Sequence, residues 1–335
     1  MIQLTPQKRQ LLMRTVTRRE TSLLIFTLVL IVAVSIHSPR FLSVTNFNDI
    51  LLNGAILAIA SIGQMMVVIT GGIDLSVGSG LALSGMLVGL IYKYDYGLNP
   101  LLALLLGALI GIALGSVNGV LVSKAGVPPI IASLGTMSIY RGLIFIVSKG
   151  QWVNAHEMPD SFIRLARGHI LGIPNLIFMT IFFYVAFYYF LTHLKTGREI
   201  YAVGGNAEAA RVAGISVDRI KYAVYAMSGF LYGLCGVLWV SRFASAQSDS
   251  ATGFEFSTVT AIVIGGVSVF GGTGKITGVL LGAVLISIVE NALAVTQVSP
   301  FWKLAIQGFI ILLAVTVDAV MKNRDRKTVI RGRQV

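Results

Sequence analysis

Residues 195–221 read KTGREIYAVGGNAEAARVAGISVDRIK, a polar segment that lies between two long apolar runs at 176–194 and 222–240. In a chain this apolar, a polar segment of such length must lie outside the hydrocarbon of a membrane. Its basic residues predict that it faces the cytoplasm. Gly205 and Gly214 would delimit a short Ala-rich helix over 207–212. We therefore expect an exposed helix that docks a soluble partner.

The composition of the whole chain indicates a polytopic membrane protein. Of 335 residues, 55% are hydrophobic and 12% are charged, about half the charged share of a soluble domain, and the mean hydropathy is +0.82. The net charge of +12 does not indicate nucleic-acid binding, because no basic run carries interleaved aromatic residues. The basic residues instead cluster beside apolar runs, as orientation signals do on the anionic inner leaflet of a membrane.

Apolar runs long enough to cross a bilayer predict about ten spans. An even number of spans returns both basic termini to the cytoplasm, as the positive-inside rule requires. The loops at 94–99, 148–173 and 244–256 are then expected on the outer side. The predicted spans are 21–36, 48–70, 75–92, 99–121, 128–147, 174–194, 221–243, 257–271, 276–296 and 301–321.

The predicted fold is therefore all-α, a polytopic transmembrane helical bundle with a cytoplasmic coupling helix. We expect a basic cytoplasmic N-terminus over 1–20, a transmembrane domain over 21–321 with the cytoplasmic loop 195–221, and a basic cytoplasmic C-terminus over 322–335. The break at Gly71–Gly72 and the short run at 257–271 predict broken or re-entrant helices. Non-helical backbone at membrane depth is tolerated only where protein buries it or where it lines a cavity.

Glycine recurs at every fourth residue in two stripes. Small residues at this spacing let two helix backbones approach closely. The stripes therefore predict tight helix packing rather than chemistry. They comprise Gly107, Gly111, Gly115 and Gly119, and then Gly274, Gly278 and Gly282.

Five polar residues within or beside the predicted spans are candidates for the translocation path or its gate: Asp74, Gln64, Asn118, Glu290 and Asn291. Asp74 follows the glycine break and is placed to cap the next helix, or to act in gating. An ionisable group such as Glu290 inside a span marks function by default, although water or Lys303 could also serve it. Gln64 and Asn118 are neutral and could equally form interhelical hydrogen bonds.

Residues 271–275, GGTGK, lack the features of a phosphate-binding loop. Val269 stands where the first glycine is needed, and Ile276 stands where a hydroxyl would bind magnesium. No other segment offers an ATP site, so no cofactor is expected on this chain. The histidines lack metal-ligand spacing, and neither a nucleophile elbow nor a carboxylate pair indicates an enzyme.

Four segments together give the chain a resemblance to the membrane-permease subunits of ABC sugar importers of the ribose/xylose/arabinose type. The resemblance extends over about residues 20–321. At 257–259 the chain reads Ser-Thr-Val where members of that family often carry an acidic residue and alanines, so the substrate does not carry over. The four segments are TGGIDLSVGS at 70–79, NGVLVSKAGVPPIIASLGTMSIYR at 118–141, GREIYAVGGNAEAARVAGI at 197–215 and GFEFSTVTAIVIGGVSVFGGTG at 253–274.

The resemblance implies that two permeases, identical or related, form a path across the bacterial inner membrane. It implies a cytoplasmic ATPase pair that holds ATP and Mg²⁺, and a periplasmic binding protein that delivers a small sugar such as ribose, rhamnose or xylose. The polar residues of the docking helix would contact the ATPase while Ala209 and Ala210 pack closely. The implied ATPase-coupling residues are Asn206, Glu208, Ala209, Ala210, Arg211 and Gly214.

Two other classes of transport protein stay open. A secondary transporter of a small polar solute, driven by an ion gradient, would need paired carboxylates or histidine relays inside the spans, and Glu290 is the one clear mid-span acid. A passive channel would need a ring of carbonyls or charges formed by oligomerisation. The sequence carries no signature of such a selectivity ring.

Overall fold

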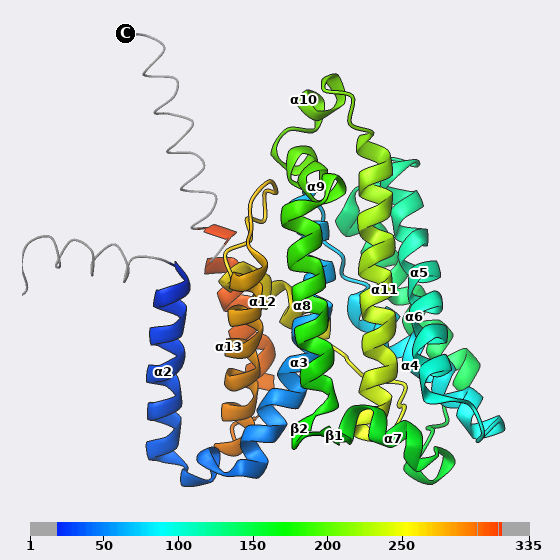
Figure 1. The fold of residues 1–335 in the computed structure, drawn as a ribbon, viewed down its shortest axis with the longest axis vertical. Helices are drawn as coiled ribbons and strands as arrows, with labels where there is room; N and C mark the ends of the chain where they lie inside the picture. The colour runs from blue at the N-terminus through cyan, green and yellow to red at the C-terminus, as the bar shows by residue number, and fades with distance from the viewer. Residues whose placement is uncertain (1–18, 300, 314, 317–335) are drawn as a thin grey trace, which may run out of the picture.

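The structure, a computed structural model, describes residues 19–299, 301–313 and 315–316. Long helices run along the molecule and form one bundle (Figure 1). The termini predicted over 1–20 and 322–335 lie outside the described residues, except for Arg19 and Glu20. The elements are α2 (Arg19–His37), the 3-10 helix η1 (Pro39–Leu42), α3 (Val44–Ile69), α4 (Val77–Tyr94), α5 (Pro100–Ser123), α6 (Pro129–Ser148), η2 (Ala155–Glu157), α7 (Asp160–Arg167), β1 (His169–Ile170), β2 (Ile173–Pro174), α8 (Asn175–His193), α9 (Lys195–Gly205), α10 (Ala207–Val212), α11 (Val217–Phe243), α12 (Phe254–Ile264), α13 (Ile276–Val295) and a last helix, Phe301–Leu313.

The predicted all-α bundle is confirmed. Within the described residues, seven helices are long and apolar enough to cross a membrane: α3, α4, α5, α6, α8, α11 and α13. The apolar helices Leu23–His37, Phe254–Ile264 and Phe301–Leu313 are shorter. Many side chains on α6 and α8 are apolar and exposed, for example Ile146 and Phe182. An apolar outer surface is what a helix facing lipid requires, because lipid offers no hydrogen-bond partners.

The span predicted at 257–271 is wrong. α12 ends at Ile264 after 11 residues, a length of about 16 Å that crosses about half of the hydrocarbon core. Residues 265–275 continue without helix, and Gly266, Gly271 and Gly272 adopt positive φ there. Glycine adopts this conformation at no steric cost, so the glycine-rich sequence ends the helix early. The alternative of a short or re-entrant helix is the one that the structure adopts.

The break predicted near Gly71–Gly72 is confirmed, because α3 ends at Ile69 and α4 begins only at Val77. α3 lies in the core of the bundle, where it contacts α8, α11, α12 and α13. Nearly every residue of α3 from Gly54 onward is buried. Burial on all sides explains why this helix reads as apolar around its whole circumference.

Both glycine stripes are packing surfaces, as predicted. The first joins α5 to α11, where a Cβ at Gly111 would overlap the carbonyl oxygen of Gly229. The second joins α13 to α12, where a Cβ at Gly282 would overlap the carbonyl oxygen of Ala261. At these positions the two backbones are in contact, so glycine is required.

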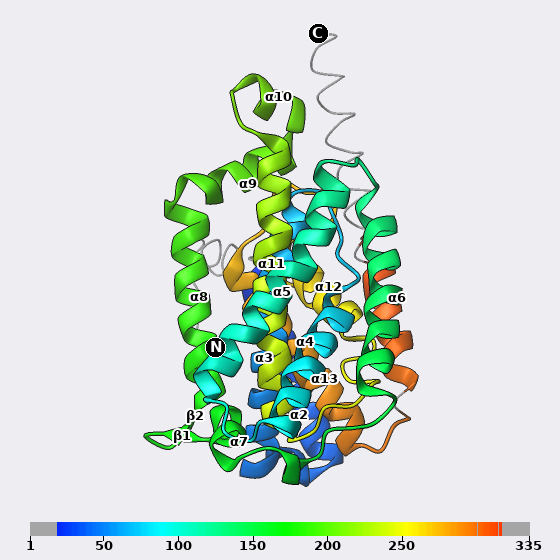
Figure 2. The ribbon, with the colours of Figure 1, turned by 90° about the vertical axis from the view of Figure 1, so that its right-hand side faces the viewer.

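The bundle has two distinct ends. Figures 1 and 2 show α9 and α10 at one end, and α7 with the β1–β2 hairpin at the other. The hairpin is antiparallel and pairs His169 with Pro174 and Ile170 with Ile173. We call these the α10 end and the α7 end. The polar segment 195–221 and the predicted outer loop 148–173 therefore lie at opposite ends, as the alternation of spans requires.

Candidate functional site

The predicted helix over 207–212 forms as α10 and projects beyond the ends of the long helices (Figures 1 and 2). Asn206 caps its first turn, because the side-chain oxygen accepts a hydrogen bond from the backbone N–H of Ala209 at 3.0 Å. At its other end, Gly214 adopts a φ of +82°, and the N–H of Ile215 donates to the carbonyl of Ala210 at 3.0 Å. This left-handed closure favours glycine. The two ends of α10 are therefore set by local side-chain and backbone chemistry.

The side chains of α10 divide into a buried and an exposed set. Ala210 is buried against the rest of the chain, with 4% of its surface exposed. Glu208, Ala209 and Arg211 are exposed. Val212 is also exposed, at 90%, although it is apolar. Val212 was not predicted from the sequence as a residue exposed for contact with a partner. Its one signal in the sequence is that it is an apolar residue within a polar segment. The exposed set offers a carboxylate, a guanidinium and two small apolar groups to a partner.

α9 connects α10 to the interior of the bundle. Gly204 of α9 lies so close to the carbonyl oxygen of Ile69, the last residue of α3, that a Cβ would overlap it. The same oxygen accepts a hydrogen bond from the N–H of Gly272 at 2.9 Å, and the Tyr201 hydroxyl donates to the carbonyl of Gly274 at 3.0 Å. Burial raises the pKa of Tyr201 above its ordinary value of 10.0, so the phenol stays a neutral donor. A displacement of α9 would therefore reach both the end of α3 and the loop before α13.

Two of the predicted path residues, Asp74 and Asn118, come together. The Asp74 carboxylate accepts hydrogen bonds from the Ser76 N–H at 2.9 Å and from the Ser76 hydroxyl at 2.6 Å. The Asn118 amide donates to that hydroxyl at 2.8 Å and to Asp74 at 3.4 Å, and the Thr136 hydroxyl donates to Asn118 at 2.8 Å. The N-cap of α4 is Ser76 rather than Asp74. Asp74 therefore organises the break before α4 and ties it to α5 and α6.

The other predicted path residues lie apart from this group: Glu290 and Asn291 have partners of their own, and Gln64 has none among the described residues. Glu290 accepts from the Ser257 hydroxyl at 2.8 Å and pairs with Lys303 at 3.1 Å, which is the pairing that the sequence allowed. Asn291 exchanges two hydrogen bonds of 2.9 Å with Asn46, which joins the end of α13 to the start of α3. The Gln64 side chain is fully buried, and among the described residues neither of its amide atoms has a hydrogen-bond partner. Hydrogen bonds thus join Asp74 to Asn118 but link neither of them to Glu290 or Asn291.

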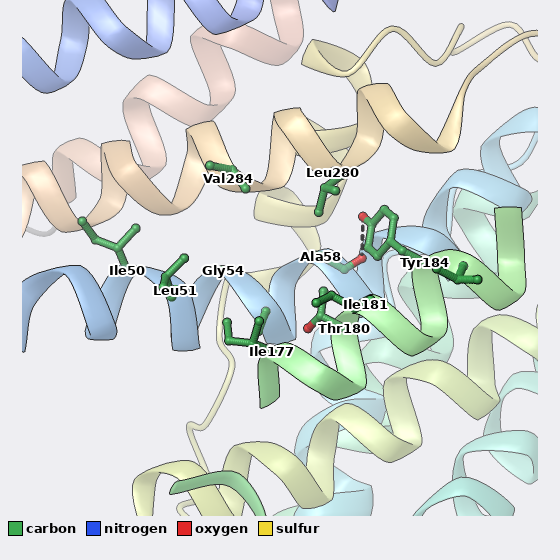
Figure 3. A pocket seen from close by; sticks show the side chains of 12 residues that line it. Ile50, Leu51, Gly54, Ala58, Ile177, Thr180, Ile181, Tyr184, Leu280 and Val284 are labelled. Atoms are coloured by element: carbon green, nitrogen blue, oxygen red, sulfur yellow. Dashed lines mark hydrogen bonds between the residues drawn. The ribbon is translucent and has the colours of Figure 1, made fainter. Parts of the chain in front are cut away.

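An apolar groove of about 380 Å³ lies between α3, α8 and α13 (Figure 3). Ile50, Ile177 and Val284 contribute to its lining. Its hydroxyls are already engaged, because Thr180 donates to the carbonyl of Leu176 at 2.8 Å and Tyr184 donates to the carbonyl of Ala58 at 3.2 Å. The groove therefore presents hydrocarbon rather than donors for a hydroxylated solute.

Residues 46–315 match the family model described as branched-chain amino acid transport system / permease component. Curated relatives cover most of the chain. The ribose import permease protein RbsC of Escherichia coli (strain K12) is 39% identical over 301 residues, 89% of this chain and 93% of that protein. The L-arabinose ABC transporter permease protein AraH of Azospirillum brasilense is 36% identical over 89% of this chain and 87% of that protein. The D-allose transport system permease protein AlsC of Escherichia coli (strain K12) is 33% identical over 88% and 90%. No solved structure matches the chain.

Proposed function

Since this chain belongs to the branched-chain amino acid transport system / permease component family, we propose that it forms the membrane path of an ATP-driven importer of a small sugar. It is a multi-pass membrane protein and a transport component rather than an enzyme. The sugar is proposed from its relatives, which are named for ribose, allose and arabinose. An aldose of this size is therefore the substrate class that we expect.

The observation that carries the proposal is the connection from α10 to the interior. α10 exposes Glu208 and Arg211 at the tip of the molecule, and α9 beneath it contacts the end of α3 and the loop 265–275. Each of these two contacts lies where a helix is interrupted. In transporters, interrupted helices typically form the substrate site near the middle of the membrane. A soluble ATPase that moves α10 would thus act, through α9, on the two interrupted segments of the bundle.

The proposed partners follow from this arrangement. Two ATPase subunits, which carry ATP and Mg²⁺, would bind the α10 end in the cytoplasm, and a sugar-binding protein would bind the α7 end in the periplasm. A second permease copy, identical or related, would complete the path in the bacterial inner membrane. Both termini would then lie in the cytoplasm. The basic residues of segment 195–221 support this orientation by the positive-inside rule.

Charge reversal at Glu208 tests the docking assignment. Glu208→Lys should leave the protein in the membrane, because the side chain is exposed, but should lower ATP-dependent sugar uptake and ATPase recovery in the purified complex. Asp218→Lys is the matched control, because it reverses an exposed acid in the first turn of α11, at the same end of the bundle but outside α10. Normal uptake and ATPase recovery with Glu208→Lys at normal expression would remove the assignment.

The ion-gradient alternative finds less support. Such a transporter needs carboxylates that exchange ions within the spans. The Glu290 carboxylate forms an ion pair with Lys303 and accepts a hydrogen bond from the Ser257 hydroxyl, so it already has partners within this chain. Uptake by the purified chain alone in liposomes, driven by a proton or sodium gradient, would establish that alternative in place of the ATP-driven one.

A further inference from the structure

The segment that follows α11 enters the bundle instead of staying at its surface. At the α7 end, Ala246 pairs with Val153 and lies beside Gly89 of α4. Only five residues later, the carbonyl oxygen of Ala251 lies 2.8 Å from the position that a Cβ of Gly78 would occupy. Gly78 and Gly89 are about 16 Å apart along α4. Residues 246–251 therefore descend about that distance alongside α4.

This descent corrects the expectation that 244–256 is wholly an outer loop. Non-helical backbone at membrane depth must be buried by protein or must line a cavity that admits water. Part of the segment is held by protein, because Arg141 of α6 donates to the carbonyl of Ser250 at 2.7 Å, and the Ser148 and Ser248 hydroxyls lie 3.5 Å apart. The half-length helix α12 begins where the descent ends, at Phe254. Other residues of the segment, among them Gln247, Asp249 and Thr252, face a cavity.

This cavity has a volume of about 410 Å³ and lies between α11 and the descending segment. The volume falls in the range of small-molecule sites, about 300–1,000 Å³. Trp239 and Phe243 line it from α11, while Gln247, Asp249 and Thr252 line it from the segment. Unlike the hydrocarbon groove of Figure 3, it combines aromatic rings with an amide, a carboxylate and a hydroxyl.

The chemistry of the lining fits a sugar. The ring of Trp239 is held in place by its neighbours, with ring centroids 4.8 Å from Phe243 and 5.6 Å from Phe254 in an edge-on contact. A fixed aromatic surface matches the C–H face of an aldose ring. Asp249 is exposed, so its carboxylate can accept hydrogen bonds from sugar hydroxyls. The Thr252 hydroxyl donates to the backbone carbonyl of Asp249 at 2.6 Å, and its oxygen can still accept a hydrogen bond.

We infer that this cavity is a sugar-contact site of the permease itself, which receives a free aldose at the outer side before the sugar passes deeper into the path. The inference rests on the proposed function and adds to it a location and a chemical class of ligand. It predicts that part of the selectivity lies in the permease. Trp239 would stack on the sugar ring, and Asp249 would select for ring hydroxyls.

Cysteine protection tests the site directly in the complete complex. Cys235 is the chain's one cysteine and is fully buried, so its reaction with a maleimide should be slow. A membrane-impermeant maleimide added from outside should label Thr252→Cys, and D-ribose, D-allose or L-arabinose should slow that labelling. At a concentration about ten times its Kd, a competing sugar should slow it about tenfold. Ser161→Cys, exposed on α7 at the same end and outside the cavity, is the control and should label at an unchanged rate.

Each outcome decides for or against the site. Equal labelling of Thr252→Cys with and without all three sugars overturns it, and so does protection by L-leucine in place of the aldoses.

Asp249→Asn provides a second measurement that needs no cysteine. It should raise the KM of uptake about tenfold, because it weakens a hydrogen bond to a charged group, and an unchanged KM contradicts the inference. If the wild-type complex imports none of the aldoses, the proposed function itself fails. If it imports one of them while the cysteine stays unprotected, only the site fails.

Discussion

Substituting Gly204 tests the mechanical connection between α10 and the bundle. A Cβ at Gly204 would overlap the carbonyl oxygen of Ile69, and it would come within 2.7 Å of the N–H nitrogen of Gly272. Both contacts are with backbone, which cannot rotate away. Gly204→Ala must therefore displace α9 from the end of α3 and strain the 2.9 Å hydrogen bond between Gly272 and Ile69.

The cost can be estimated from these contacts. Overpacking in a close contact costs about 1–3 kcal/mol, and the weakened hydrogen bond about 1 kcal/mol more. The better helix propensity of alanine offsets up to about 1 kcal/mol. The free energy of unfolding should fall by about 1–3 kcal/mol, which for a chain of 335 residues corresponds to a Tm lowered by roughly 1–4 °C. Gly205→Ala is the matched control, because a Cβ at Gly205 meets nothing within 4 Å.

The assay compares the two alanine variants in the purified complex. Thermal unfolding in detergent reports stability, and ATP hydrolysis with and without sugar-loaded binding protein reports coupling. We expect Gly204→Ala to lose stability and to uncouple hydrolysis from sugar, while Gly205→Ala behaves as the wild type. If Gly204→Ala and Gly205→Ala have equal Tm and equal sugar-dependent hydrolysis, α9 does not transmit motion through the end of α3.

Two further predictions concern the α7 end and the break before α4. The ion pair of 2.8 Å with Lys93 holds the pKa of Glu157 below its ordinary value of 4.5. The stabilising effect of this ion pair is therefore complete above pH 4.5 and is lost as the pH falls through the lowered pKa. The Tm of Glu157→Gln should lie below that of the wild type at pH 7, and the two Tm values should converge in acid; a difference that stays constant with pH would contradict this prediction. Asp74→Asn keeps a side-chain oxygen that can accept hydrogen bonds from Ser76. Asp74→Leu removes that oxygen and leaves the buried donors of Ser76 and Asn118 without an acceptor, so it should lower the free energy of unfolding by about 1–3 kcal/mol more than Asp74→Asn does. Equal Tm values for the two variants would show that these hydrogen bonds do not stabilise the break.

The sequence alone was sufficient for features that depend on local chemistry. Charge and hydropathy predicted a polytopic bundle with the segment 195–221 at one end of it, because a bilayer separates polar from apolar residues along the chain itself. The sequence predicted α10 over 207–212 between Gly205 and Gly214; the structure adds Asn206 as its N-cap, and both caps act within a few residues. The glycine stripes predicted close helix contacts, although not which helices would meet.

Tertiary structure decided which polar groups meet and where polar segments lie. Asp74 and Asn118 are hydrogen-bonded although 44 positions separate them. Glu290 of α13 forms its ion pair with Lys303, which lies on the next helix, Phe301–Leu313. The polar residues of 244–256 read equally well as an outer loop or as the lining of a cavity, since water is present in both places. Only the packing of Ala246 and Ala251 along α4 places the segment inside. Polarity shows that a residue needs water or a partner, and the arrangement of distant helices determines which of the two it has.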